Sequence, residues 1–395
     1  MLTFLLVIIY LSFISLGLPD SLLGTAWPVM RFEFGASLDF AGVISMIITA
    51  GTIVSSLLSD RMTRRFGAGA VTAVSVAMTA AALFGFSVSR SLFAMCLWSI
   101  PYGLGAGAVD AALNNYVALH YSARHMSWLH CFWGVGASIS PYIMGAALSM
   151  QLGWRKGYLA VSVIQIALAL FLFASLPVWK KARLRAAQSG DDETAYPPVG
   201  LLRALRIPGV PYILTAFFCE CAIEATAGLW AASYLVEHRG TDAETAAFFV
   251  SAYYLGVTFG RFLIGFITDK IGDRGMIRIG CTGVCIGILL LMLPSASPIP
   301  SLAGLVVLGL GIAPIYPSII HATPANFGRE NSQAIVGIQM ASAYTGSTVI
   351  PPVFGLLAEY VAVSLYPFYL AVFAVLMFIM TERLNAMMKK KNNPS

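Results

Sequence analysis

The sequence predicts an all-α polytopic membrane protein, and three observations carry that prediction. Of the 395 residues, 58% are hydrophobic and only 11% are charged, whereas a soluble protein needs roughly a quarter of its residues charged. The hydrophobic residues form continuous runs of about twenty or more, each long enough to cross a hydrocarbon core of about 30 Å as a helix. These runs are rich in Gly, Ala and Leu without strand-like alternation, which argues against a membrane β-barrel.

We expect twelve membrane-spanning helices from these runs. The first run has no basic residues before it and no small-residue cleavage site, so we expect a retained helix and not a secretory signal. The expected spans are residues 4–30, 39–58, 68–87, 91–119, 127–150, 158–178, 209–236, 245–267, 276–294, 300–322, 333–358 and 363–382.

The distribution of Lys and Arg among the loops predicts the orientation. If both termini are cytoplasmic, the loops and ends on that side hold 18 Lys and Arg residues, and the outer loops hold 5. Because basic residues are enriched on the cytoplasmic side, we expect both termini there, in a bacterial inner membrane. The net charge of +6 then reflects topology and contact with lipid headgroups, and nucleic acid is not an expected partner.

The chain divides into two similar blocks of six spans. A polar segment separates them, which predicts an N-terminal bundle over residues 1–178, a cytoplasmic linker over 179–208, and a C-terminal bundle with a cytoplasmic tail over 209–395. The loop "SLLSDRMTRRFG" after span two is matched by "GFITDKIGDRG" after span eight, and the offset between Asp60 and Asp269 also relates His130 to Gln339. This coincidence predicts a duplicated six-helix unit.

Charged and polar side chains inside the spans are the candidate functional residues, because charges in a membrane are costly and generally face a bundle interior. Asp110 and Asn114 are four residues apart on one helical face, and His130 and Trp133 are three apart on the next span. A carboxylate and an amide beside an aromatic ring suit a sugar, whose hydroxyls and C–H faces they can contact. A carboxyl group in such a cavity can also exchange a proton as its hydration alternates. The structural alternative is an interhelical tie for Asp110 and His130 and ordinary packing for Trp133.

Span seven adds a second pair of acids. Glu220 and Glu224 are four residues apart on one face, so we expect at least one of them to be protonated or paired. The residues expected on these grounds to contact the solute are Asp20, Asn114, Asn115, His130, Trp133, Glu220, Glu224, Trp230, Gln339 and Tyr344, and those expected to couple a proton are Asp20, Asp110 and Glu224.

Over its whole length the chain resembles the major facilitator superfamily. The family's loop motif, G-x-x-x-D-[RK]-x-G-[RK]-[RK], is matched by "GFITDKIGDR", with Asp273 in place of a basic residue; in the first copy Ser56 and Thr63 replace the two glycines. The resemblance implies a fold of two pseudo-symmetric six-helix bundles. It also implies gating roles for Asp60, Arg61, Arg261, Asp269 and Lys270.

Within that family the chain resembles the fucose:proton symporter branch. The resemblance rests on "GLPDSLLG" with Asp20, on "GAVDAALNN" with Asp110, and on "GLGIAPIYPSII" with Tyr316. His130 and Trp133 stand where that branch has glutamine and asparagine. The resemblance implies that Asp110 takes the transported proton, that Asp20 couples to sugar, and that Tyr316 is a further contact of the solute.

The expected function is therefore proton-coupled symport of a monosaccharide or similar small polar solute by alternating access, in a monomer without metal or cofactor. An antiporter that exports a drug or metabolite would use the same acids, and sodium coupling is a further alternative. A transporter fold used for sensing is another. The six cysteines lack metal-site spacing, and HExxH, G-x-S-x-G and P-loop motifs are absent from the sequence, so we do not expect an enzyme.

Overall fold

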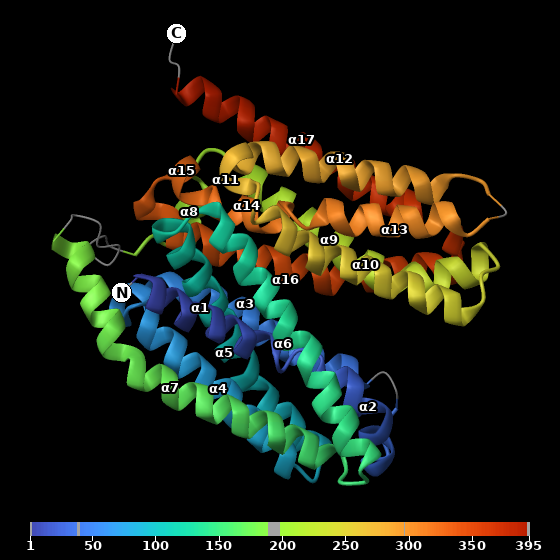
Figure 1. Ribbon diagram of the computed structural model, residues 1–395, viewed down its shortest axis with the longest axis horizontal. Coiled ribbons are helices and arrows are strands. Elements are labelled where there is room, and N and C mark those ends of the chain that lie inside the picture. Colours follow the sequence, from blue (N-terminus) through green and yellow to red (C-terminus); the bar gives the residue numbers. More distant parts are fainter. Residues whose placement is uncertain (1, 38–39, 189–197, 296, 393–395) are drawn as a thin grey trace. The chain divides into compact units, whose positions relative to one another are not determined.

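The computed structural model describes residues 2–37, 40–188, 198–295 and 297–392, and its regular elements over those residues are all helices (Figure 1). Eleven helical stretches, some of them made of two consecutive elements, are long and apolar enough to cross a membrane. These are Phe4–Glu33, Phe40–Phe66, Ala68–Val88, Leu92–His120, Ala123–Ser149, Trp154–Arg185, Val210–His238, Glu244–Ile264, Asp273–Met292, Ile299–His321 and Val363–Lys390. The chain is therefore a multi-pass membrane protein, as its composition predicts.

The one expected span that is not among these eleven, residues 333–358, lies in α16 (Arg329–Tyr360). This helix carries buried amides, Gln333 and Gln339, among its apolar residues, and its length of 32 residues exceeds what a membrane crossing needs. With α16 included, the helix count agrees with the predicted twelve.

Two expected spans are interrupted. The first consists of α1 (Leu2–Gly17) and α2 (Leu22–Glu33), and the turn between them contains Pro19 and Asp20. The tenth consists of α13 (Ile299–Ile312) and α14 (Ile315–His321), interrupted beside Pro314. Proline has no backbone N–H and cannot continue a helical hydrogen-bond ladder. Such breaks leave backbone and side-chain polar groups available at membrane depth, which transporters use to build binding sites.

One compact unit comprises the described residues of 1–116, 129–200 and 329–341. It holds α1, α2, α3 (Phe40–Phe66), α4 (Ala68–Val88), α7 (Trp154–Gln188), most of α5 (Leu92–His120) and of α6 (Ala123–Ser149), and the start of α16. Helices α4 and α7 lie side by side (Figure 1). Glycine permits this close packing, because a side chain at Gly69 would overlap the ring of Trp179.

The second compact unit comprises the described residues of 117–128, 201–328 and 342–395. Its helices are α8 (Leu201–Leu205), α9 (Val210–Ser233) with its π-helical extension η2 (Tyr234–His238), α10 (Ala243–Ile264), α11 (Thr268–Ile271), α12 (Asp273–Met292), α13, α14, α15 (Thr323–Phe327), the rest of α16, the 3₁₀ turn η3 (Val363–Leu365) and α17 (Tyr366–Asn392), together with the end of α5 and the start of α6. Helix α13 packs against α10 and α12, and α9 packs against α17. The units exchange segments 117–128 and 329–341 relative to the sequence halves, so the division at the linker stays a prediction.

Candidate functional site

Three buried polar side chains of the first unit form a hydrogen-bonded chain. Asp110 is 3% exposed, Asn114 0% and His130 6%. The Asn114 Nδ2 atom donates to Asp110 Oδ1 at 2.8 Å, and His130 Nε2 lies 3.1 Å from Asn114 Oδ1. Because an amide oxygen only accepts, His130 Nε2 carries a proton and donates to it. The carboxyl group and the amide of α5 are thus connected to an imidazole of the next helix, α6.

Helix geometry places two of these groups on one face. Asp110 and Asn114 are successive-turn neighbours on α5. The glycines on the same stripe make room for helix α3 and not for a ligand: a side chain at Gly107 would overlap the backbone oxygen of Thr52, and one at Gly103 would overlap that of Ile48. The stripe therefore fixes how α5 packs, which in turn sets the direction of Asp110.

Asp20 forms the second half of the site. It lies in the turn between α1 and α2 and is exposed. Trp133 Nε1 donates to Asp20 Oδ2 at 2.9 Å, and the Tyr102 hydroxyl donates to Oδ1 at 3.3 Å. Trp133 follows His130 by one turn of α6, so one helix contributes both the indole to Asp20 and the imidazole to the Asp110 chain.

The second unit contains a separate acidic cluster. Arg261 Nη2 donates to Glu224 Oε2 at 2.8 Å, and the guanidinium lies 5.9 Å from the centre of the Tyr316 ring. Glu220 is fully buried; the Cys221 thiol donates to its Oε2 at 3.1 Å, and its Oε1 has no hydrogen-bond partner within the described chain. Two ionised carboxylates beside one guanidinium would leave a buried negative charge, so the arrangement favours a proton on Glu220.

The other residues predicted to contact solute lie in different surroundings. Trp230 Nε1 donates to the Pro351 carbonyl at 2.8 Å, which ties α9 to α16. The Ser332 hydroxyl donates to Asn115 Oδ1, away from the Asp110 chain, because consecutive helical residues point about 100° apart. Gln339 is buried on α16 in the first unit, and Tyr344 is half-buried in the second.

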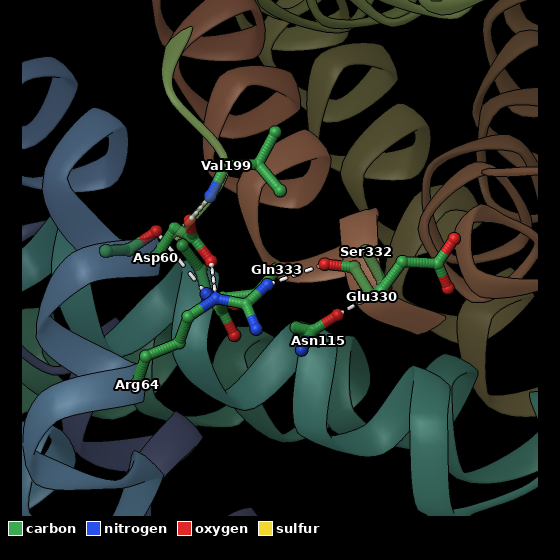
Figure 2. Close-up of polar contacts among 9 residues, drawn as sticks. Asp60, Arg64, Asn115, Val199, Glu330, Ser332 and Gln333 are labelled. Carbon is green, nitrogen blue, oxygen red and sulfur yellow. Dashed lines mark hydrogen bonds and ion pairs between the residues drawn. The ribbon is translucent and has the colours of Figure 1, made fainter. Parts of the chain in front are cut away.

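Asp60 links three segments of the first unit. Figure 2 shows its carboxylate between the Arg64 guanidinium, at 2.6 Å from Nε, and the Val199 backbone N–H, at 2.8 Å. Arg64 Nη2 also donates to the Glu330 carbonyl at 2.6 Å. In the same view Ser332 reaches Asn115. Gln333 Nε2 donates to Ser59 at 3.4 Å. The start of α16 is thereby tied to α3 and α5.

Asp269 makes the matching contact in the second unit. Its carboxylate accepts from the Arg124 backbone N–H at 3.1 Å and from the Ser122 hydroxyl at 3.2 Å, at the beginning of α6. Asp269 thus holds the start of α6 directly, whereas Asp60 holds Arg64, and it is Arg64 that reaches the start of α16. Arg61 and Lys270 are exposed. Arg261, to which the family resemblance assigns a gating role, lies against Glu224.

Sequence reasoning did not identify two contributors. Tyr102 binds Asp20, and the Val199 N–H binds Asp60. A tyrosine inside a span carries no signal that separates a ligand contact from packing, and a backbone donor carries none at all. No group of three or more His, Cys, Asp and Glu side chains that could hold a metal occurs in the described ranges.

Helical spans with buried acids and broken helices are typical of membrane transporters. The chain belongs to the Major Facilitator Superfamily, whose family model matches residues 9–297 and 213–392. It is thus a membrane transporter and not an enzyme.

Individual relatives are distant. The cis,cis-muconate transport protein of Acinetobacter baylyi is 24% identical over 365 residues, covering 89% of this chain and 86% of that protein. The glucose/mannose transporter GlcP of Bacillus subtilis is 20% identical over 349 residues, covering 86% and 84%. A crystal structure of the E. coli fucose:proton symporter FucP matches 97% of this chain and 98% of its own, with a TM-score of 0.75 and 15% identity; this likeness shows the fold.

Proposed function

We propose that the protein is a proton-coupled symporter of a monosaccharide, a hexose or deoxyhexose, working by alternating access. The observation that carries the proposal is the pairing of two linked groups on α6: His130 joins Asn114 and buried Asp110, and Trp133 joins exposed Asp20. One face of a single helix therefore couples a proton-exchanging carboxyl group to a sugar-binding one.

The exposed half suits a sugar. The Trp133 ring offers an apolar face for C–H groups, and the Asp20 carboxylate can accept hydrogen bonds from two neighbouring hydroxyls. A sugar hydroxyl that replaces the Trp133 N–H or the Tyr102 hydroxyl on Asp20 preserves the satisfied state of that carboxylate. The names of GlcP and FucP, as carriers of sugars, support this substrate class.

The buried half suits a proton. An ionised Asp110 accepts from Asn114, which fixes the amide so that its oxygen faces His130. A protonated Asp110 can donate, which frees the amide to turn and offers its N–H groups to a solute. Protonation of Asp110 thus changes the hydrogen-bonding pattern beside Asp20 without leaving a buried charge. Glu224, released from Arg261, is the corresponding proton carrier of the second unit.

The proposal also includes the other residues predicted to contact the solute or to act in gating. Asn115, Glu220, Trp230, Tyr316, Gln339 and Tyr344 are further contacts of the solute during the cycle. Asp60, Arg61, Arg261, Asp269 and Lys270 act in gating, where contacts at helix starts must break when the halves rock. The protein works as a monomer in a bacterial inner membrane, with both termini in the cytoplasm.

Flux in liposomes tests the proposal. The purified protein is reconstituted and uptake of labelled hexoses and deoxyhexoses is measured with and without an inward proton gradient, for the wild type, Asp110→Asn and the matched control Asp242→Asn. Gradient-driven accumulation that Asp110→Asn loses, while solute exchange at equal pH continues, supports the proposal. Asp242, an exposed carboxylate that caps α10, serves as a control whose replacement leaves accumulation unchanged.

The same vesicles separate the alternatives. A sodium gradient replaces the proton gradient in one arm, and labelled muconate is added to the panel because one relative carries that name. Accumulation that follows sodium replaces the proton in the mechanism. Absence of any sugar movement, with extrusion of a dye or movement of an organic acid, rejects the sugar symporter in favour of an exporter or an acid carrier.

A further inference from the structure

His321 is held between two hydrogen-bond acceptors in the second unit. Its Nδ1 lies 2.8 Å from Asp273 Oδ2, and its Nε2 lies 3.2 Å from the backbone carbonyl oxygen of Tyr121. His321 is the last residue of α14 and Asp273 the first residue of α12, whereas Tyr121 lies between α5 and α6. The imidazole therefore joins a segment from the first half of the sequence to two helices of the second half.

The two contacts fix the number of protons. A carbonyl oxygen only accepts, so Nε2 must carry a hydrogen. The Nδ1 to carboxylate contact needs one more proton, either on Nδ1 or on Asp273. Neutral histidine with an ionised aspartate has only one hydrogen on the ring and cannot form both bonds. The pair thus holds an extra proton, and the reference acidities of the two groups place it on the imidazole.

The His321–Asp273 pair is mostly buried, and a second acidic side chain, Asp269, lies near it. The side chains of His321 and Asp273 are 20% and 18% exposed, and Asp273 Oδ1 is buried without a hydrogen-bond partner within the described residues. Asp269 on α11 adds negative charge near His321, and it is itself bound by Arg124 on α6.

Two titratable groups next to the contact come from the segment that joins α5 and α6, residues 117–128, called here the α5–α6 segment. Burial raises the pKa of the Tyr121 phenol to about 12, so that group stays neutral across the physiological range. His125 packs edge-on against the rings of Tyr121 and Trp128, at 5.7 and 5.8 Å. It is a second histidine that a test must separate from His321.

We propose that His321 and Asp273 form a proton-binding site that latches the α5–α6 segment onto α12 and α14. After loss of the proton, the one remaining ring hydrogen stays on Nδ1, where it faces the Asp273 carboxylate. The hydrogen bond from Nε2 to the Tyr121 carbonyl is then lost together with the charge attraction to Asp273, and the segment is released. The site explains why an aspartate stands at position 273, where the loop motif has a basic residue: a basic side chain there would repel a charged His321. The latch responds to pH on its own side of the membrane and is independent of which solute is carried.

Nitrogen NMR of the purified full-length protein, labelled only in its five histidines, reads the protonation directly. The His321 signals are assigned by their loss in His321→Gln. We expect both ring nitrogens of His321 to be protonated at neutral pH in the wild type and to show a neutral tautomer in Asp273→Asn. A neutral His321 in the wild type at mildly acid pH, or a signal unchanged by Asp273→Asn, overturns the proposal.

Hydrogen–deuterium exchange of peptides from residues 117–128, corrected for intrinsic pH effects, reads the latch. We expect exchange of this segment in the wild type to rise about tenfold as the pH is raised from neutral into the alkaline range, as expected for loss of a hydrogen bond to a charged group. His321→Gln cannot titrate and should show a flat profile, whereas the control His125→Gln should keep the wild-type profile. A pH-dependent rise that survives in His321→Gln, or disappears in His125→Gln, rejects His321 as the switch.

Discussion

Replacing Glu224 by Gln removes the negative charge that faces Arg261 in the second unit. The two side chains are 23% and 6% exposed, and Arg261 Nη2 lies 2.8 Å from Glu224 Oε2. The guanidinium stays charged at every accessible pH, so the substitution leaves an uncompensated charge in a buried position. Removal of one partner of a buried ion pair costs about 3–5 kcal/mol, and we expect the free energy of unfolding to fall by that amount.

The expected change in melting temperature follows from the chain length. Unfolding entropy scales with size, so a chain of 395 residues loses about 0.8 kcal/mol of stability per degree near its midpoint. Glu224→Gln should therefore melt about 4–6 °C below the wild type. The assay is thermal unfolding in lipid nanodiscs, followed by intrinsic fluorescence at one fixed scan rate.

A second ion pair supplies the matched control. Glu382 and Arg278 form an equally short contact, at 2.7 Å, but the arginine side chain is 58% exposed. Exposed pairs contribute little, so Glu382→Gln should melt with the wild type. The double variant Glu224→Gln with Arg261→Met removes both charges and should recover most of the lost stability. If Glu224→Gln melts like Glu382→Gln, or if the double variant is no more stable than the single one, the buried charge is not the cause.

Two further predictions concern packing and capping. Gly107→Ala should lower stability by about 1–3 kcal/mol because the new methyl group overlaps α3. Gly145→Ala places its methyl group where no atom lies within 4 Å, so it should stabilise its helix slightly. Thermal unfolding compares the two variants, and equal effects would contradict the packing argument. The Thr245 backbone N–H, 2.8 Å from Asp242 Oδ1, lowers the pKa of Asp242 below its usual value of 3.8, so the cap on α10 should be complete above that pH and lost as the pH falls through the lower folded-state value. Exchange of the Thr245 amide hydrogen measures this, and protection that is independent of acid would refute it.

The sequence by itself determined the class of the fold and the local geometry of its helices. A hydrocarbon core offers no water to backbone groups, so long apolar segments must be helical. The positions of the apolar runs along the sequence therefore give both the helices and their approximate bounds. Helical periodicity also fixed which neighbours share a face: Asp110 and Asn114 are joined by a hydrogen bond at the spacing that predicted it. The same periodicity turns Asn115 away from them, toward Ser332.

Only the tertiary structure decided which helices these faces meet. The contacts of Trp133 with Asp20, of Arg261 with Glu224 and of His321 with Asp273 and Tyr121 join residues distant in sequence. Each depends on the rotation and approach of whole helices, which are set by packing against neighbours such as the fit of Gly107 to α3. Arg261 illustrates the limit: its position in the sequence names no partner, and the packing of α10 presents it to Glu224 on α9. A side chain's identity and spacing are local properties, whereas its partner is chosen by the helix that packs opposite.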